Sequence, residues 1–171
     1  MSTSKADTLK VNFGPINARN VGTLKLLNRT ILPVRYSDKV YDEILSTPKE
    51  FTRFAYYKSI VVGAICGRLE EKPKGTVKLY IMTLGTLPAY RGRGVGSQLL
   101  QSLMDGTKQY RDIEEIYLHV QTNNSNAISF YKKFGFEVTG ELKNYYKNIP
   151  PPLDCFILTK AVPKETALAV V

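Results

Sequence analysis

The stretch 79–100, LYIMTLGTLPAYRGRGVGSQLL, places a strand pattern, a glycine-rich turn and a helix pattern in direct succession. Val77 to Leu84 is rich in β-branched and aromatic residues and predicts a strand. Apolar residues at helical spacing then predict a helix, with one face formed by Leu99, Leu100, Leu103 and Met104. The turn between the two is therefore expected to lead directly into the N-terminus of this helix.

That turn reads Arg91-Gly92-Arg93-Gly94-Val95-Gly96. Free backbone N–H groups and the helix dipole make such a helix entry a binding site for anions, and glycine lets the backbone approach a phosphate closely. No Gly-Lys-Ser/Thr follows, which excludes a nucleotide P-loop, and the spacing differs from G-x-G-x-x-G, which disfavours a dinucleotide fold. The alternative for this segment is a tight turn without a ligand.

The rest of the chain alternates short strand and helix patterns. Asn17 and Asp38 are predicted to cap two helices that precede Pro48, and Gly135 is predicted to end the helix 124–134. The element order is β-α-α-β-β-β-α-β-α-β-β, which predicts an α/β (α+β) fold with one mixed, mostly antiparallel seven-stranded sheet flanked by about four helices. We expect a flexible N-terminus over 1–8, one domain over 9–160 and a disordered tail over 161–171.

Composition narrows the protein class. The chain has 171 residues and a net charge of +9, so polyanions and phosphorylated cofactors are natural partners, but no sequence-specific nucleic-acid motif appears. Cys66 and Cys155 lie in apolar runs without metal spacing and predict two buried free thiols and no metal. No signal peptide and no membrane span are expected, which favours a cytoplasmic protein, with the nucleus as a second location.

The glycine-rich turn and the element order together resemble the GNAT acetyltransferase superfamily. In that family, main-chain amides of the turn hold the diphosphate of acetyl-CoA. Four further stretches extend the resemblance to the N-terminal acetyltransferases of the family over about 9–160: YIMTLG at 80–85, YLHVQ at 117–121, NSNAISFYKKFGF at 124–136 and NYY at 144–146. The resemblance therefore implies an enzyme that uses acetyl-CoA as cosubstrate and needs no metal.

By this resemblance, Tyr80 and His119 form the catalytic pair and act through an ordered water that takes a proton from the substrate amine. An α-amine with a pKa near 7.7–8.0 costs only about 1 kcal/mol to neutralise at cytosolic pH, whereas a lysine near 10.4 costs roughly 4–5 kcal/mol. A neutral histidine suffices for the first task. The alternatives are a hydrogen-bonded sheet histidine and a core tyrosine.

The resemblance also assigns the residues that hold acetyl-CoA. They are Leu84, Arg91, Gly92, Arg93, Gly94, Val95, Gly96, Ser97, Asn124 and Tyr131. Tyr131 would in addition contact or protonate the departing thiolate, or else be an ordinary aromatic on a buried helix face. Asn124 could equally be a helix N-cap.

The peptide-binding residues implied by the resemblance come from two loops and one strand. They are Pro33, Val34, Tyr36, Met82, Tyr145, Tyr146 and Ile149. An apolar pocket with an amine at its mouth suits a starting methionine. Leu32 stands where animal relatives carry an aromatic residue, and Pro150-Pro151-Pro152 alters the final loop, so the preference for the first two residues stays open. Tyr145 and Tyr146 could instead be exposed loop aromatics.

The predicted function is transfer of acetyl from acetyl-CoA to the α-amine of Met-starting polypeptides, directly and without a covalent enzyme intermediate. The resemblance adds partners, namely the auxiliary and catalytic subunits of the NatA complex at the ribosome. The alternatives are a lysine acetyltransferase on the same fold and a non-catalytic subunit of that complex.

Overall fold

A computed structural model describes residues 7–147 and 153–164 of the chain, and it falls into two compact units. Unit 1 comprises Met1–Arg68 and Ile81–Tyr110, and unit 2 comprises Leu69–Tyr80 and Arg111–Val171. Strands β3 (Ile60–Glu71) and β4 (Val77–Thr86) contribute residues to both units. Each unit is described by itself below.

The described strands form one sheet with the order β1-β2-β3-β4-β5-β7-β6. The remaining strands are β1 (Asn12–Pro15), β2 (Thr52–Tyr57), β5 (Ile113–Gln121), β6 (Glu137–Tyr146) and β7 (Leu153–Ala161). Strands β4 and β5 run parallel, whereas the pairs β1/β2, β2/β3, β5/β7 and β6/β7 are antiparallel. The predicted mixed, mostly antiparallel seven-stranded sheet is confirmed.

Four α-helices and one 3₁₀ turn lie in the described residues: α1 (Val21–Ile31), α2 (Asp38–Ser46), η1 (Pro88–Tyr90), α3 (Val95–Thr107) and α4 (Ser125–Lys133). The cap predictions for the first two helices were wrong. Asn20 and Ser37 occupy the N-cap positions. Asn17 instead closes a turn, because its side chain accepts from the Arg19 N–H, and α1 begins only after this turn.

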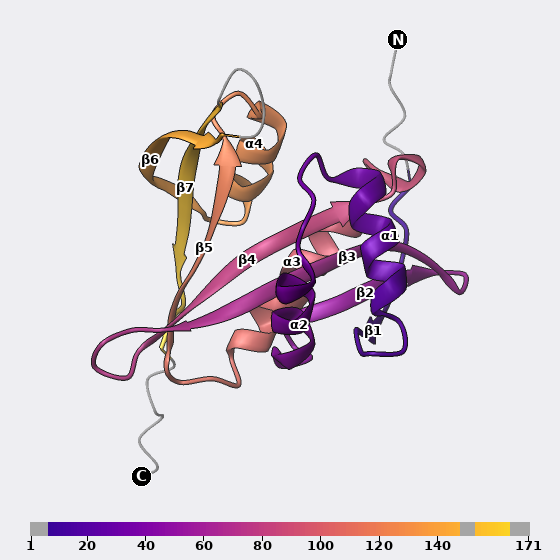
Figure 1. The fold of residues 1–171 in the computed structure, drawn as a ribbon, viewed down its shortest axis with the longest axis horizontal. Coiled ribbons are helices and arrows are strands. Elements are labelled where there is room, and N and C mark those ends of the chain that lie inside the picture. The colour runs from indigo at the N-terminus through magenta and orange to yellow at the C-terminus, as the bar shows by residue number, and fades with distance from the viewer. Residues whose placement is uncertain (1–6, 148–152, 165–171) are drawn as a thin grey trace. The chain divides into compact units, whose positions relative to one another are not determined.

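The core of unit 1 lies between its helices and strands. Leu24 of α1 and Ile44 of α2 belong to one buried cluster with Phe54 and Ala64 of β2 and β3. A side chain on Gly63 would approach Leu99 of α3 to 3.2 Å, so α3 covers the opposite face of these strands. Figure 1 shows α1 and α2 in front of β2 and β3, with α3 behind. In unit 1, helices therefore flank the strands on both faces, which agrees with the predicted flanking helices.

Unit 2 packs α4 against β5, β6 and β7 (Figure 1). The Tyr131 ring contacts Phe136 edge-on at 5.5 Å, and Phe136 is fully buried. Gly135 ends α4 at a φ of +88°, and a side chain there would meet the Lys160 ammonium at 2.6 Å. The positive φ favours glycine at this position, as the sequence predicts, whereas the Lys160 side chain could move aside.

Both cysteines are free and buried, as predicted. Burial raises the pKa of the Cys66 thiol to about 12 and also raises the pKa of Cys155. Neither thiol is therefore set up as a thiolate nucleophile at neutral pH. Within 7–147 and 153–164, no helix combines the length and the apolar character needed to cross a bilayer.

Candidate active site

The glycine-rich turn of unit 1 connects η1 to α3. Gly92 and Gly94 have φ values of +70° and +78°, a left-handed conformation that glycine adopts without steric cost. Gly94 is the N-cap of α3 in this conformation. A side chain at Gly92 would meet no atom within 4 Å, so the turn is open to solvent at this point.

The amide nitrogens of this turn are free to bind an anion. Among the described residues, no acceptor pairs with the backbone N–H groups of Gly92 to Ser97, and the first bond of α3 runs from Gln98 N to the Gly94 carbonyl at 3.1 Å. The first turn of this 13-residue helix carries no acidic side chain that would compete. These donors and the positive end of the helix dipole fit a diphosphate, the group expected from acetyl-CoA.

Side-chain contacts hold the turn from behind. Gln98 donates to the Leu9 and Gly94 carbonyls at 2.6 Å and 3.0 Å, and Leu9 N donates to the Arg93 carbonyl at 2.9 Å. The guanidinium of Arg93 donates to the Asp7 carbonyl at 3.2 Å. Arg93 thus has a structural role in addition to its predicted one. No sequence pattern pointed to Gln98, because its partner Leu9 lies 89 residues away in the chain.

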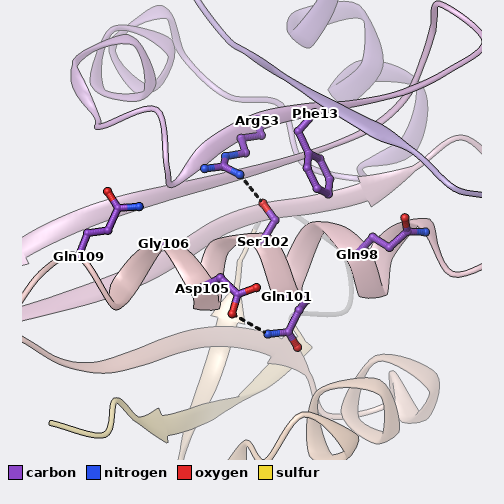
Figure 2. Close-up of a pocket in the computed structure, with 8 residues that line it drawn as sticks. All are labelled: Phe13, Arg53, Gln98, Gln101, Ser102, Asp105, Gly106 and Gln109. Carbon is purple, nitrogen blue, oxygen red and sulfur yellow. Dashed lines mark hydrogen bonds between the residues drawn. The ribbon is translucent and has the colours of Figure 1, made fainter. Parts of the chain in front are cut away.

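A separate groove of about 460 Å³ runs along α3 in unit 1 (Figure 2). Its walls come from Phe13 and Arg53 on one side and from α3 on the other. The Arg53 guanidinium donates to Ser102 Oγ at 3.1 Å, and Gln101 donates to Asp105 at 3.1 Å. The first bond fastens β2 to α3, and the second lies within α3. The groove contains none of the predicted catalytic residues.

Unit 2 brings the predicted catalytic pair together. Tyr80 of β4 and His119 of β5 are 39 residues apart in the chain, yet the Tyr80 hydroxyl lies 2.9 Å from His119 Nδ1. β4 and β5 pair in parallel over Val77–Tyr80, and the register opposes Tyr80 to Tyr117. Because side chains alternate along a strand, Tyr117 and His119 share one face. Ring contacts at 4.9 Å (Tyr80–Tyr117) and 5.3 Å (Tyr80–His119) complete the cluster.

A distortion of β6 adds Tyr145 to this cluster. Asn144 has a φ of +52°, and the pairing with β7 shifts between Leu142 and Tyr146. The Tyr145 ring stacks on His119 at 4.7 Å, and its hydroxyl lies 3.4 Å from the same Nδ1. Asparagine tolerates the left-handed region, and the bulge re-aims the neighbouring side chain. Tyr145 is 42% exposed but belongs to β6 and contacts His119, so it is not a loop aromatic.

The electrostatics of His119 favour its neutral form. Burial lowers the pKa of His119 below 6.5, and the Glu70 carboxylate opposes this shift. At neutral pH the imidazole is therefore mostly unprotonated and available as a base. For Nδ1 to accept from the Tyr80 hydroxyl, the ring proton must lie on Nε2.

Two predicted cofactor residues belong to α4 in unit 2. Asn124 is the N-cap, and its side chain accepts from the Ala127 N–H at 3.2 Å, which confirms the capping alternative. Tyr131 is 8% exposed, and burial raises its pKa far above 10. A phenol in this state stays protonated and can only donate its hydrogen or pack.

We expect Asn124→Ala to lower the free energy of unfolding by about 1 kcal/mol, because the α4 N–H loses its side-chain acceptor. Thermal or urea unfolding measures this difference. Asn124→Ser is the matched control, since serine also caps helices well and should recover most of the loss. Equal stability of the alanine variant and the wild type would contradict the capping role.

The predicted peptide-binding residues divide between the units. Pro33, Val34 and Tyr36 follow α1, and Tyr36 and Met82 pack against the unit 1 core cluster. Along β4 every second side chain from Tyr80 to Leu84 is only partly buried, which places Met82 and Leu84 on the face that the sequence predicts. In unit 2, Tyr146 contacts Tyr145 edge-on at 5.0 Å. Ile149 lies outside the described residues.

Comparisons with known proteins agree with this geometry. The model of the acetyltransferase (GNAT) family matches residues 23–136. The chain is 40% identical to N-alpha-acetyltransferase 50 of Danio rerio, over 90% of this chain and 89% of that protein. It is 41% identical to the probable N-acetyltransferase san of Drosophila melanogaster, over 89% and 81% respectively. The chain belongs to the GNAT acetyltransferase family.

A solved structure narrows the likeness within this family. Arabidopsis thaliana Naa50, in complex with the bisubstrate analogue CoA-Ac-MVNAL, is 49% identical and superposes with a TM-score of 0.82. The match covers 89% of this chain and 99% of that one. The particular proteins that this chain resembles are therefore the N-alpha-acetyltransferases of the Naa50 and san type.

Proposed function

We propose that this protein transfers acetyl from acetyl-CoA to the α-amine of polypeptides that begin with methionine, by direct transfer. Its likeness to N-alpha-acetyltransferase 50 supports the class, an acetyl-CoA-dependent N-terminal α-acetyltransferase of the NatE type. The observation that carries the chemistry is the 2.9 Å contact between the Tyr80 hydroxyl and His119 Nδ1. This contact places the Tyr80 hydroxyl, which can pass on a proton, next to the His119 imidazole, which can accept one.

The cluster can remove the proton of a substrate amine in one relay. The Tyr80 hydroxyl gives its proton to His119 Nδ1 and takes in exchange the proton of the amine, passed on by the ordered water that the resemblance implies. His119 suits this task because its lowered pKa keeps the imidazole neutral at pH 7, and Nδ1 can then accept a proton when the ring hydrogen lies on Nε2. The demand on the base is modest, since an α-amine titrates near 7.7–8.0. The same base is poorly matched to a lysine amine.

In this proposal, the residues of the glycine-rich turn bind the diphosphate of acetyl-CoA. The amides of Gly92 to Ser97 would donate to its oxygens, and Arg91 would add a positive charge beside them. When bound, acetyl-CoA supplies the activated acetyl thioester. Tyr131 would donate its hydroxyl proton toward the thiolate that leaves. Leu84 and Asn124 would contact the pantetheine arm.

The side chains that the resemblance assigns to peptide binding are apolar and suit a substrate that begins with methionine. Pro33, Val34 and Tyr36 provide apolar surface in unit 1, and Tyr145 and Tyr146 provide it in unit 2. The analogue bound to Arabidopsis Naa50 carries the peptide MVNAL, which also begins with methionine. We further propose association with the NatA subunits at the ribosome, and a cytoplasmic location; the net charge of +9 suits a polyanionic surface.

A parallel acetylation assay tests the proposed function. We expect Met-Val peptides to be acetylated at least about 10-fold more efficiently than peptides that present only a lysine amine, because neutralising lysine costs several kcal/mol more. Isothermal calorimetry with acetyl-CoA is the control. Binding of acetyl-CoA without transfer to any peptide would favour a scaffold role, and preferential transfer to lysine would overturn the proposal.

A further inference from the structure

The cluster around His119 extends to a carboxylate that sequence analysis did not single out. The Tyr117 hydroxyl donates to a carboxylate oxygen of Glu70 at 2.5 Å, although the two residues are 47 positions apart. Glu70 lies near the end of β3, Tyr117 lies on β5, and both belong to unit 2. A hydrogen bond from a hydroxyl to a carboxylate is charge-assisted and helps to hold both partners in place.

The Tyr117 ring links this carboxylate to the catalytic pair. It lies 4.9 Å from the Tyr80 ring and 5.9 Å from the His119 ring, the latter edge-on at 88°. A ring fixed at its hydroxyl end therefore limits the orientations open to both Tyr80 and His119. Lys78 lies 5.4 Å from the face of the same ring and forms an ion pair with Glu115.

Within 7–147 and 153–164, each element next to His119 contributes a group that faces it. Tyr80 comes from β4, Tyr117 from β5 and Tyr145 from β6. The pairing partner on β7 is Ile157, which carries no charge. Glu70 is the carboxylate that acts on His119, and its charge favours the imidazolium. It also acts on Lys78, whose charge is balanced locally by Glu115.

We propose that Glu70 is a positioning residue, which holds Tyr117 against the catalytic pair and sets the pH at which His119 takes up a proton. This inference rests on the proposed function for its catalytic meaning. A negative charge near the imidazole stabilises the state that forms when His119 accepts the substrate proton, so the histidine becomes a stronger base.

The test uses the fact that His119 is the single histidine of the chain. NMR titration of the imidazole follows its pKa without reference to activity, and the pH profile of kcat/KM follows it in turnover. Glu70→Gln keeps an acceptor for Tyr117 but removes the charge. We expect the titration midpoint to fall by about 0.3 to 1 unit, the acid limb of kcat/KM to move down with it, and kcat at pH 7 to fall about 2- to 10-fold.

Three further variants make the result specific. Glu71→Gln removes the same charge from an exposed neighbour and should leave the midpoint and kcat unchanged. Glu70→Asp should return the midpoint most of the way to the wild-type value. Tyr117→Phe should lower kcat while the midpoint stays within about 0.2 units, because the Glu70 charge remains.

An unchanged His119 midpoint in Glu70→Gln, or an equal shift in Glu71→Gln, would overturn the inference. If Glu70→Gln did not fold, the titrations of Glu70→Asp and Tyr117→Phe would still test the inference. A His119 midpoint in Tyr117→Phe that falls as far as the midpoint expected for Glu70→Gln would contradict it. Absence of acetyl transfer by the wild type would refute the proposed function alone, since the titration does not depend on turnover.

Discussion

Replacing His119 with alanine is expected to lower kcat/KM for a Met-starting peptide by about 10²- to 10⁴-fold, the range that general-base catalysis contributes. The imidazole Nδ1 lies 2.9 Å from the Tyr80 hydroxyl, and no second histidine exists in the chain to replace it. Steady-state kinetics at several peptide concentrations measure the effect. The loss should fall on kcat, because the proton is moved in the transition state and not in the ground state.

Two measurements separate this role from a structural one. Acetyl-CoA affinity of His119→Ala should match the wild type by calorimetry, because the amides of the glycine-rich turn do not depend on the histidine. Tyr80→Phe removes a single hydroxyl from the same relay and should also lower kcat with little change in KM. Full activity of either variant would refute the catalytic role assigned to that residue.

Replacing Gly92 with valine is expected to weaken acetyl-CoA binding by at least about 10-fold, which corresponds to 1.4 kcal/mol. Gly92 has a φ of +70°, and a branched residue there costs roughly 1–2 kcal/mol or forces the backbone to another conformation. Either response moves the amides that would donate to the diphosphate. Calorimetric titration with acetyl-CoA gives the dissociation constant directly.

Gly75 offers a matched control in the same chain. Its φ is +74°, and, as at Gly92, a side chain would meet no atom within 4 Å, but it lies in the connection between β3 and β4. Gly75→Val should therefore lose similar stability and bind acetyl-CoA normally. Equal affinities in the two variants would show that the turn at Gly92 does not hold the cosubstrate.

The sequence predicts most of the fold because its signals are local. The alternation in β4 and β5 places Tyr80 and His119 on the less buried faces that the structure shows. The predicted caps of α1 and α2 were wrong, because several neighbouring polar residues can each cap a helix. Asn17 and Asn20 both bond within one turn ahead of α1: Asn17 accepts from the Arg19 N–H and Asn20 accepts from the Asn17 N–H. Only the folded backbone shows that Asn20 is the residue directly before the helix.

The candidate site also has one part that the sequence predicts and one part that only the tertiary structure decides. The glycine-rich turn is determined by the sequence itself, because left-handed backbone and free helix N–H groups are properties of consecutive residues. The contacts of His119 with Tyr80, Tyr145 and, through Tyr117, Glu70 join residues from four strands, and they depend on strand order, on register and on the bulge at Asn144. Only the tertiary structure decides these, because a pairing register brings distant residues together without leaving a local pattern in the chain.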